Sequence, residues 1–191
     1  GQLRIGNKYY LPVPTLDSMT IGSFYINYQT KRIYAKLFDK VGLNESELAL
    51  LPSVFNFSNN NNFIMRGINV VQAGWSMSSG ARFNSIDNLL VEDCKFNHNR
   101  YMGIGFSRIK NATFRDVEMC HNGGKGGGGS WSTTGYLRNV LYERIKVNYN
   151  NWMNYQYGWY SWDPCGIKFA ALRQVKVKDS EFIGNYATGL W

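Results

Sequence analysis

An internal repeat constrains the fold of this chain more than any other feature of its sequence. Four 15-residue units align without gaps, at Ser85–Asn99, Arg108–Asn122, Tyr136–Asn150 and Ala171–Asn185, and a weaker fifth unit precedes them at Asn59–Ala73. A unit this short cannot bury an apolar face alone, so the units must stack on one another to form a core. The repeat therefore predicts a solenoid.

The apolar residues of each unit follow a pattern typical of strands. They recur at unit positions 2, 5, 7, 10 and 12, and position 7 holds Val91, Phe114, Tyr142 and Val177. Two alternating stretches separated by two polar residues predict two short strands joined by a tight corner. Similar sequences between the units, at 103–106 and 166–169, predict a third strand in each coil. We therefore expect an all-β parallel β-helix of about five coils over residues 51–191.

The polar positions of the units test this stacking independently. Position 8 holds Glu92, Arg115, Glu143 and Lys178, and position 11 holds Lys95, Glu118, Lys146 and Glu181. In both columns the charge changes sign from one unit to the next. Parallel stacking at about 4.8 Å would therefore place each charge between two opposite ones. Position 4 holds Asn88, Asn111, Asn139 and Gln174, an amide column that can hydrogen-bond along the stack.

Residues 1–50 do not repeat and form a separate N-terminal region. Phe24–Tyr28 and Ile33–Leu37 predict a β-hairpin that caps or flanks the first coil. Asn44 followed by Glu47 resembles a helix start and predicts a short helix over residues 44–51. At the other end, Gly189–Trp191 matches the first strand of a further coil, cut short. We expect this open edge to self-associate and the chain, as an incomplete module, to turn over no substrate by itself.

The composition excludes several classes of protein. Hydrophobic residues make up 44% and charged residues 18% of the chain, which excludes a disordered protein, and 21 Asn, 20 Gly and 30 aromatic residues favour strands and tight turns. No apolar run reaches the roughly 20 residues of a membrane helix. The net charge of +8 is spread along the chain without a nucleic-acid-binding motif. Cys94, Cys120 and Cys165 have no metal-ligand spacing with each other or with His98 and His121, so we expect buried thiols, no metal site and no evident cofactor.

The longest segment between units, residues 151–170, is the main candidate for a functional site. It contains six aromatic residues within eleven positions, namely Trp152, Tyr155, Tyr157, Trp159, Tyr160 and Trp162. Trp and Tyr offer an apolar ring and a polar group, which suits the CH face and hydroxyl edge of a sugar. A mini-core that folds the segment on itself is the alternative. We predict that these residues, with Trp131 of the neighbouring coil, bind polysaccharide.

Few charged residues are left for chemistry once the charge columns are assigned. Asp163 lies in the aromatic segment, and Lys168 should point out of the tube between the inward Ile167 and Phe169. We take both as candidate catalytic residues, Asp163 as an acid/base or hydroxyl-binding group and Lys168 as a group that binds a uronate or lowers the pKa of a substrate's α-proton. His98 and His121 precede the Asn that ends a unit, and they are interpreted as turn residues with a catalytic base as the alternative. The glycine-rich run 123–130 lacks P-loop spacing and is expected to form a flexible loop.

The chain resembles the right-handed parallel β-helix superfamily that includes the pectate-lyase-like proteins. The resemblance covers residues 20–191 and rests on GSFYINYQTKRIYAKLF, VEDCKFNHN, RDVEMCHNGG and NNWMNYQYGWYSWDPCGIKF followed by NYATGLW. It implies a carbohydrate-active protein, a lyase or glycoside hydrolase acting on polysaccharides including acidic ones, that is bacterial and secreted, periplasmic or on the cell surface. Calcium is implied by this resemblance alone. A structural or adhesive β-helix, such as a tail-spike or surface-fibre segment, is the alternative function.

Overall fold

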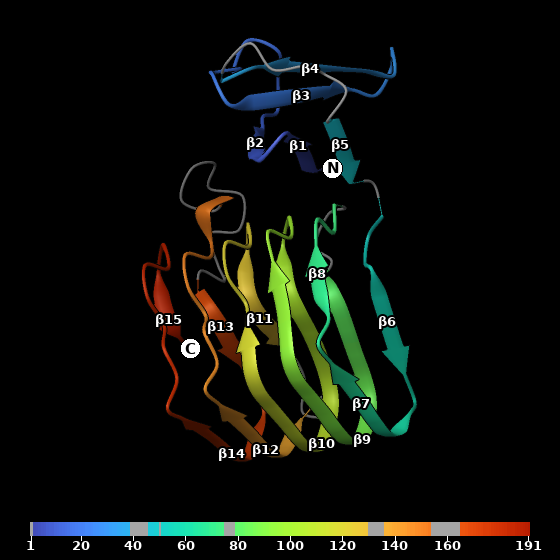
Figure 1. Ribbon diagram of the computed structural model, residues 1–191, viewed down its shortest axis with the longest axis vertical. Coiled ribbons are helices and arrows are strands. Elements are labelled where there is room, and N and C mark those ends of the chain that lie inside the picture. The colour runs from blue at the N-terminus through green and yellow to red at the C-terminus, as the bar shows by residue number, and fades with distance from the viewer. Residues whose placement is uncertain (1, 39–45, 50, 75–78, 130–135, 154–164) are drawn as a thin grey trace.

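The computed structural model describes all residues except 1, 39–45, 50, 75–78, 130–135 and 154–164. Its named elements are all β-strands, arranged in two sheets, and the predicted all-β class is confirmed. The smaller sheet contains the N-terminal residues. The larger sheet winds through the rest of the chain (Figure 1).

The N-terminal sheet has the strand order β4-β3-β2-β1-β5. These strands are β1 (Gln2–Ile5), β2 (Lys8–Pro12), β3 (Ser23–Asn27), β4 (Arg32–Lys36) and β5 (Ser46–Ala49). The predicted hairpin is confirmed as β3–β4, in which Phe24 pairs with Ala35 in an antiparallel ladder. Leu3, Ile5, Tyr10 and Phe24 form the buried core of this sheet.

The helix predicted over residues 44–51 is wrong, because residues 46–49 form β5. This strand pairs antiparallel with β1, and the register places Glu47 directly opposite Arg4. The two side chains form an ion pair with Arg4 Nη2 2.6 Å from Glu47 Oε1. The carboxylate that we interpreted as a helix-capping group thus serves a cross-strand ion pair, which local sequence does not reveal.

The remaining strands form a parallel β-helix, as predicted, with a number of coils close to the expected value. They are β6 (Phe55–Ser58), β7 (Asn61–Arg66), β8 (Asn69–Val71), β9 (Ser79–Asn97), β10 (Met102–Glu118), β11 (Lys125–Gly129), β12 (Leu137–Glu143), β13 (Cys165–Phe169), β14 (Leu172–Lys178) and β15 (Thr188–Leu190). One column of the parallel register runs through Phe55, Ala81, Ile104, Gly127, Ile167 and Leu190. Each step along this column advances the chain by one coil.

The predicted core positions are buried in the three central units. Phe114 and Tyr142, at position 7, are fully buried and their rings stack with centroids 4.8 Å apart. Position 10 holds the buried Cys94, Val117 and Ile145. The corresponding apolar residues of the last unit are less covered, and Leu172 is 45% exposed. All three cysteines are buried free thiols, as expected.

The corners of the coils use a left-handed backbone at fixed unit positions. Positions 4, 9 and 14 have positive φ in all four main units, at Asn88, Asn111, Asn139 and Gln174, at Asp93, Asp116, Arg144 and Asp179, and at His98, His121, Tyr149 and Gly184. Asn, Asp and Gly tolerate this conformation best. The polar residues that interrupt the strand pattern therefore mark the places where the chain turns.

The position-8 charge column forms a continuous ion-pair ladder, and the position-11 column forms two ion pairs. Arg115 lies 3.1 Å from Glu92 and 3.0 Å from Glu143, and Lys178 lies 3.1 Å from Glu143. In the second column, Lys95 pairs with Glu118 at 3.3 Å and Lys146 with Glu181 at 4.0 Å. The amide column is present in part: Asn139 Nδ2 donates to Asn111 Oδ1 at 2.8 Å, whereas Asn111 Nδ2 donates to Asp87 Oδ1 at 2.8 Å and not to Asn88. The stacking register deduced from the repeat is therefore correct.

Position 15 forms a ladder of asparagines inside the fold. Each amide nitrogen donates to the amide oxygen of the next unit, Asn99 to Asn122 at 3.1 Å, Asn122 to Asn150 at 3.0 Å and Asn150 to Asn185 at 3.0 Å. The same oxygen also accepts the backbone N–H of the preceding unit's asparagine, as in Asn99 N to Asn122 Oδ1 at 2.9 Å. The ladder satisfies buried polar groups at the corner where the variable segments leave the coils.

The glycine-rich run contributes a strand rather than a loop over the part that the structure describes. Residues 125–129 form β11, which pairs in parallel with β10 and β13. A Cβ at Gly126 would lie 2.8 Å from the Met119 carbonyl oxygen and 2.8 Å from Val147 Cγ1. The glycines therefore permit close packing at this corner, and the flexible loop that we predicted is wrong for these residues.

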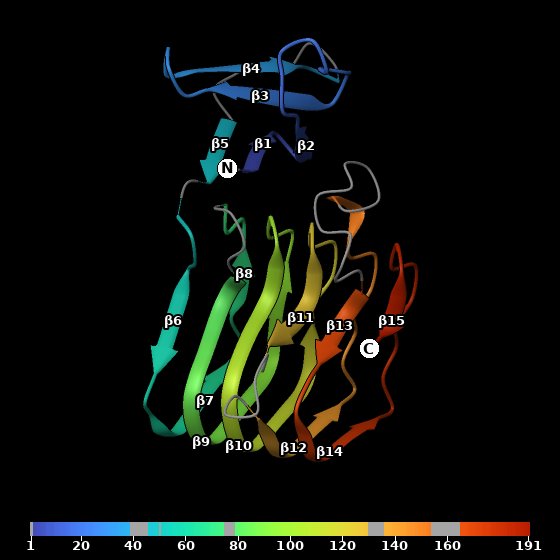
Figure 2. The same ribbon diagram turned by 180° about the vertical axis from the view of Figure 1, so that it is seen from behind.

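The N-terminal sheet lies beside the β-helix, over one of its long edges, rather than over its end (Figures 1 and 2). The edge beneath it carries the position-14 corners, and the Tyr9 ring of β2 stacks on the His98 ring. The variable segments begin immediately after these corners. The sheet thus flanks the tube at the edge where we expected function.

Candidate functional site

The structure describes only two of the residues that we predicted to form the site. Trp152 and Lys168 lie within the described part of the chain. Trp131, Tyr155, Tyr157, Trp159, Tyr160, Trp162 and Asp163 lie outside it. The site can therefore be built from the residues that surround the aromatic segment and not from the segment itself.

Lys168 has the orientation expected from strand alternation. Ile167 is fully buried in the core of the β-helix and Phe169 packs against that core, whereas Lys168 lies between them on β13. Its Nζ lies 4.0 Å from the centroid of the Trp191 ring. This cation–π contact places a positive charge on the aromatic face of the residue that follows β15.

A groove lies between the N-terminal sheet and the edge of the β-helix, and we call it the aromatic groove. Its volume is about 340 Å³, and Gln2 and Leu11 of the N-terminal sheet line it. The ring-bearing residues of its lining are Tyr9, His98, His121, Tyr149, Trp152 and Tyr186. Trp152 is the first aromatic residue of the segment singled out from the sequence, so this groove lies where that segment begins.

Four of these rings form a continuous stack across the coils. The Tyr9 and His98 ring centroids are 4.2 Å apart with an interplanar angle of 7°, and His98 and His121 are 5.0 Å apart at 4°. The His121 and Tyr149 centroids follow at 5.1 Å. The next residue in the column is Gly184, where a Cβ would overlap the Tyr149 ring. The stack thus ends on a glycine that has no side chain to displace the ring.

The aromatic groove is electrically neutral around pH 7. Burial, together with the neighbouring His121, lowers the pKa of His98 to about 4, and burial also lowers the pKa of His121. None of the residues that line the groove in the described part of the chain is an acid, a lysine or an arginine. The groove therefore offers ring edges, imidazole nitrogens and phenol hydroxyls to a ligand without a net charge.

Trp152 is fixed by a hydrogen bond to the corner beneath it. Its indole Nε1 donates to the His121 carbonyl oxygen at 3.2 Å. The following Met153 is fully buried, and its N–H donates to the Gly123 carbonyl oxygen at 3.0 Å. The start of the aromatic segment is thus tied to the preceding coil.

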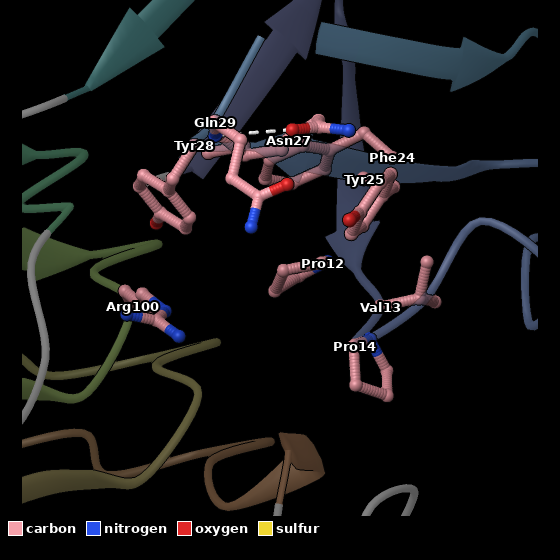
Figure 3. A pocket seen from close by; sticks show the side chains of 10 residues that line it. Pro12, Val13, Pro14, Phe24, Tyr25, Asn27, Tyr28, Gln29 and Arg100 are labelled. Atoms are coloured by element: carbon pink, nitrogen blue, oxygen red, sulfur yellow. Dashed lines mark hydrogen bonds between the residues drawn. The ribbon is translucent and has the colours of Figure 1, made fainter. Parts of the chain in front are cut away.

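A second cavity, which we call the interface pocket, is also lined by both the N-terminal region and the β-helix. It has a volume of about 470 Å³, and its lining includes Pro12, Pro14, Tyr25, Tyr28, Gln29 and Arg100. Figure 3 shows these side chains around a common space, with Arg100 contributed by the β-helix and the others by the N-terminal region. Sequence analysis missed this pocket, because no motif links residues 12–29 to residue 100.

Sequence analysis also missed Lys125, the first residue of β11. Its side chain is fully buried, which lowers its pKa to about 8; nearby Cys165 raises the pKa and Lys168 lowers it. Its Nζ lies 5.7 Å from the centroid of the Tyr101 ring. A lysine inside a glycine-rich run gives no sequence signal of burial, since such runs are ordinarily exposed.

The described residues contain neither a metal-binding cluster nor a helix that could span a membrane. No three His, Cys, Asp or Glu side chains among them are grouped as a metal site requires, so these residues do not fit the calcium that the family resemblance implied. No helix within the described ranges has the length and apolarity needed to cross a membrane.

The sequence and fold were compared with known proteins. No family model, no curated protein and no solved structure matches the chain.

Proposed function

We propose that this protein binds polysaccharide in the aromatic groove, as a carbohydrate-active β-helix of the pectate-lyase-like type. The observation that carries the proposal is the set of six ring-bearing side chains that line one groove at the variable edge of the coils. His121, Tyr149 and Tyr186 are exposed there, so a ligand can reach them. We also propose that the protein is exported, because the polysaccharides on which pectate-lyase-like proteins act are extracellular.

The chemistry of the groove suits a neutral sugar ring. The stacked rings cover one another's faces, so a ligand meets their edges, which carry imidazole nitrogens and the Tyr149 hydroxyl. These groups can donate to and accept from sugar hydroxyls. The indole of Trp152 and the phenol of Tyr186 add apolar surface for the CH face of a sugar.

The succession of coils supports an extended ligand. His98, His121 and Tyr149 occupy the same unit position in three consecutive coils, with ring centroids about 5 Å apart. A row of similar groups at regular spacing suits a polymer that crosses several coils. Polysaccharide is the polymer that this mixture of rings and hydroxyl-binding groups fits best.

The alternative function is a structural or adhesive β-helix without a saccharide ligand. The ring stack favours it, since face-to-face stacking also stabilises the docking of β2 on the corner at His98. Under this alternative the groove residues serve only to hold the N-terminal sheet in place. Binding experiments on groove variants separate the two functions.

Affinity electrophoresis against a panel of neutral and acidic polysaccharides tests the proposal. We expect the wild-type chain to be retained by at least one polymer, and Trp152→Ala with Tyr186→Ala to lose that retention. Tyr136→Ala is the matched control, because Tyr136 lies away from the groove, beside Lys110. All variants should keep the β circular-dichroism signal. Unchanged retention of the double variant, or unfolding of that variant, would instead favour the structural alternative.

A further inference from the structure

We propose that the interface pocket binds an anionic group, a carboxylate or a sulfate, carried by the saccharide. The saccharide part of this inference rests on the proposed function, whereas the anion part rests on the pocket alone. The pocket is bounded by the N-terminal region and by Arg100 of the β-helix, so it exists only where the two parts of the chain meet.

The walls of the pocket combine apolar and hydrogen-bonding groups. Pro12, Pro14 and the ring of Tyr25 supply apolar surface, while Tyr28 and Gln29 supply hydroxyl and amide groups (Figure 3). The Asn27 amide beside them is held by its own turn, since its Oδ1 accepts the N–H groups of Gln29 at 3.1 Å and Thr30 at 3.0 Å. This mixture fits a ring that carries polar substituents.

Arg100 brings a positive charge to a defined position in this pocket. Its backbone N–H donates to the Ala73 carbonyl oxygen at 2.9 Å. Its own carbonyl lies so close to Gly123 that a Cβ there would overlap the oxygen. Residue 100 also follows Asn99, the fully buried first member of the asparagine ladder. The backbone that carries the guanidinium is therefore anchored on three sides.

The composition of the lining selects the ligand. None of the residues that line the pocket within the described chain is acidic, and Arg100 is the one arginine or lysine among them. A guanidinium presents paired N–H donors that match the two oxygens of a carboxylate or sulfate. The described lining of the aromatic groove, in contrast, contains no acid, lysine or arginine. The aromatic groove thus binds neutral sugar rings, and the interface pocket binds an anionic substituent.

The linings of the two cavities are adjacent along the chain at two places. Leu11 lines the aromatic groove and the next residue, Pro12, lines the interface pocket. On the β-helix, His98 lines the groove and Arg100 the pocket, separated by Asn99. Ligands in the two cavities therefore sit on neighbouring parts of the same edge.

Three dextrans with the same backbone test the inference: unmodified dextran, carboxymethyl dextran and dextran sulfate. Dissociation constants are measured by affinity electrophoresis at physiological ionic strength. We expect the wild-type chain to bind one or both charged polymers more tightly than dextran, and the stronger of the two identifies the anionic group. Arg100→Gln should raise the Kd for that polymer about tenfold to 100-fold, the range expected for a charged hydrogen-bonded contact.

Arg138→Gln is the matched control, because Arg138 is an exposed arginine of β12 outside the pocket. It removes the same charge and measures the non-specific attraction between a basic protein and a polyanion. Tyr28→Ala is the second variant, since Tyr28 is 69% exposed and its loss should not unfold the chain. We expect Tyr28→Ala to weaken charged-dextran binding and Arg138→Gln to change it less than threefold.

Equal effects of Arg100→Gln and Arg138→Gln, or wild-type binding by Tyr28→Ala, would overturn the inference. The proposed function fails separately. If Trp152→Ala and Tyr186→Ala leave neutral-polysaccharide retention unchanged while Arg100→Gln abolishes charged-dextran binding, the anion site stands and the aromatic groove does not. The reverse result retains the groove and removes the anion site.

Discussion

The three central units of the β-helix each end in a left-handed residue followed by a buried asparagine. At the left-handed position, His98 and His121 place their rings in a stack with Tyr9 and Tyr149. The asparagine after each histidine is fully buried and hydrogen-bonds to the next coil. Position 14 thus places a side chain in the groove, and position 15 places a hydrogen-bonded side chain in the interior, where it stabilises the stack of coils.

Acid should weaken the ring stack. The unfolded chain holds the His98 pKa near its ordinary value of 6.5, whereas burial lowers the pKa to about 4 in the folded protein. The unfolded state therefore binds more protons between these two values, and the free energy of unfolding should fall as pH drops from about 6.5 to about 4. Since solvent reaches part of the ring, we expect a loss of about 1 kcal/mol, or about 2–4 °C in Tm.

Thermal unfolding of His98→Phe measures this contribution. Phenylalanine keeps a ring in the stack and removes the titrating group, so the Tm of the variant should change less with pH over this range than that of the wild type. Carboxylates such as Glu92, whose pKa is lowered by hydrogen bonds to Arg115 and Arg66, affect both proteins alike. Identical pH profiles for the two proteins would show that protonation of His98 does not weaken the stack.

At the residue scale, the sequence predicted which residues form turns but not which side chains those residues contact. His98 and His121 were interpreted as turn residues, and their positive φ values agree with that interpretation. The stacking of His98 on Tyr9 could not be predicted, because Tyr9 belongs to a non-repeating region nearly 90 residues away in the chain. Lys125 was not singled out for the same reason, since its burial depends on chain segments from other coils.

At the scale of strands, the register follows from the columns of charges. The position-8 column continues beyond the four main units, because Arg66 of β7 lies 2.8 Å from Glu92. Alternating signs favour one register. Skipping a unit would bring like charges together, and a shift along the strand would separate each charge from its opposite partner in the next coil. The ladders therefore specify the alignment of coils whose segments differ in length.

Reversing one charge in the position-11 column should destabilise the fold modestly. Glu118→Lys would place three positive charges on successive coils, next to Lys95 and Lys146. An exposed pair contributes about 0.2–1 kcal/mol, so the Tm should fall by a few degrees at low salt and by less at high salt. The triple variant Glu118→Lys, Lys95→Glu, Lys146→Glu should recover much of the loss. A triple variant no more stable than the single one would contradict the ladder.

The strands of the repeating part of the chain could be predicted from the sequence more reliably than those of segments that do not repeat. The repeat predicted the strands of the β-helix because the same pattern occurs several times and each copy checks the others. Residues 44–51 occur once, and there a local capping signal was outweighed by the pairing of β5 with β1. The strand at 125–129 was missed because glycines have no side chain to show alternation, and its pairing with β10 and β13 determines its structure.

At the scale of the whole molecule, the N-terminal sheet and the β-helix together form both cavities. The aromatic groove uses Tyr9 from the sheet with His98 and Trp152 from the β-helix, and the interface pocket uses Tyr25 with Arg100. The sequence predicted a flanking hairpin and a functional variable edge. It could not predict that the two meet, because docking depends on surfaces that share no repeat and no motif.

Hydrogen–deuterium exchange with a polysaccharide retained in electrophoresis tests most directly whether ligand binds at this junction. We predict slower exchange on binding in peptides that cover residues 2–13, 97–101, 120–124 and 148–153, which border the two cavities. Peptides from the charge ladders of β12 and β14 should exchange as in the free protein. Protection confined to those ladders, or to any face remote from the N-terminal sheet, would contradict the account.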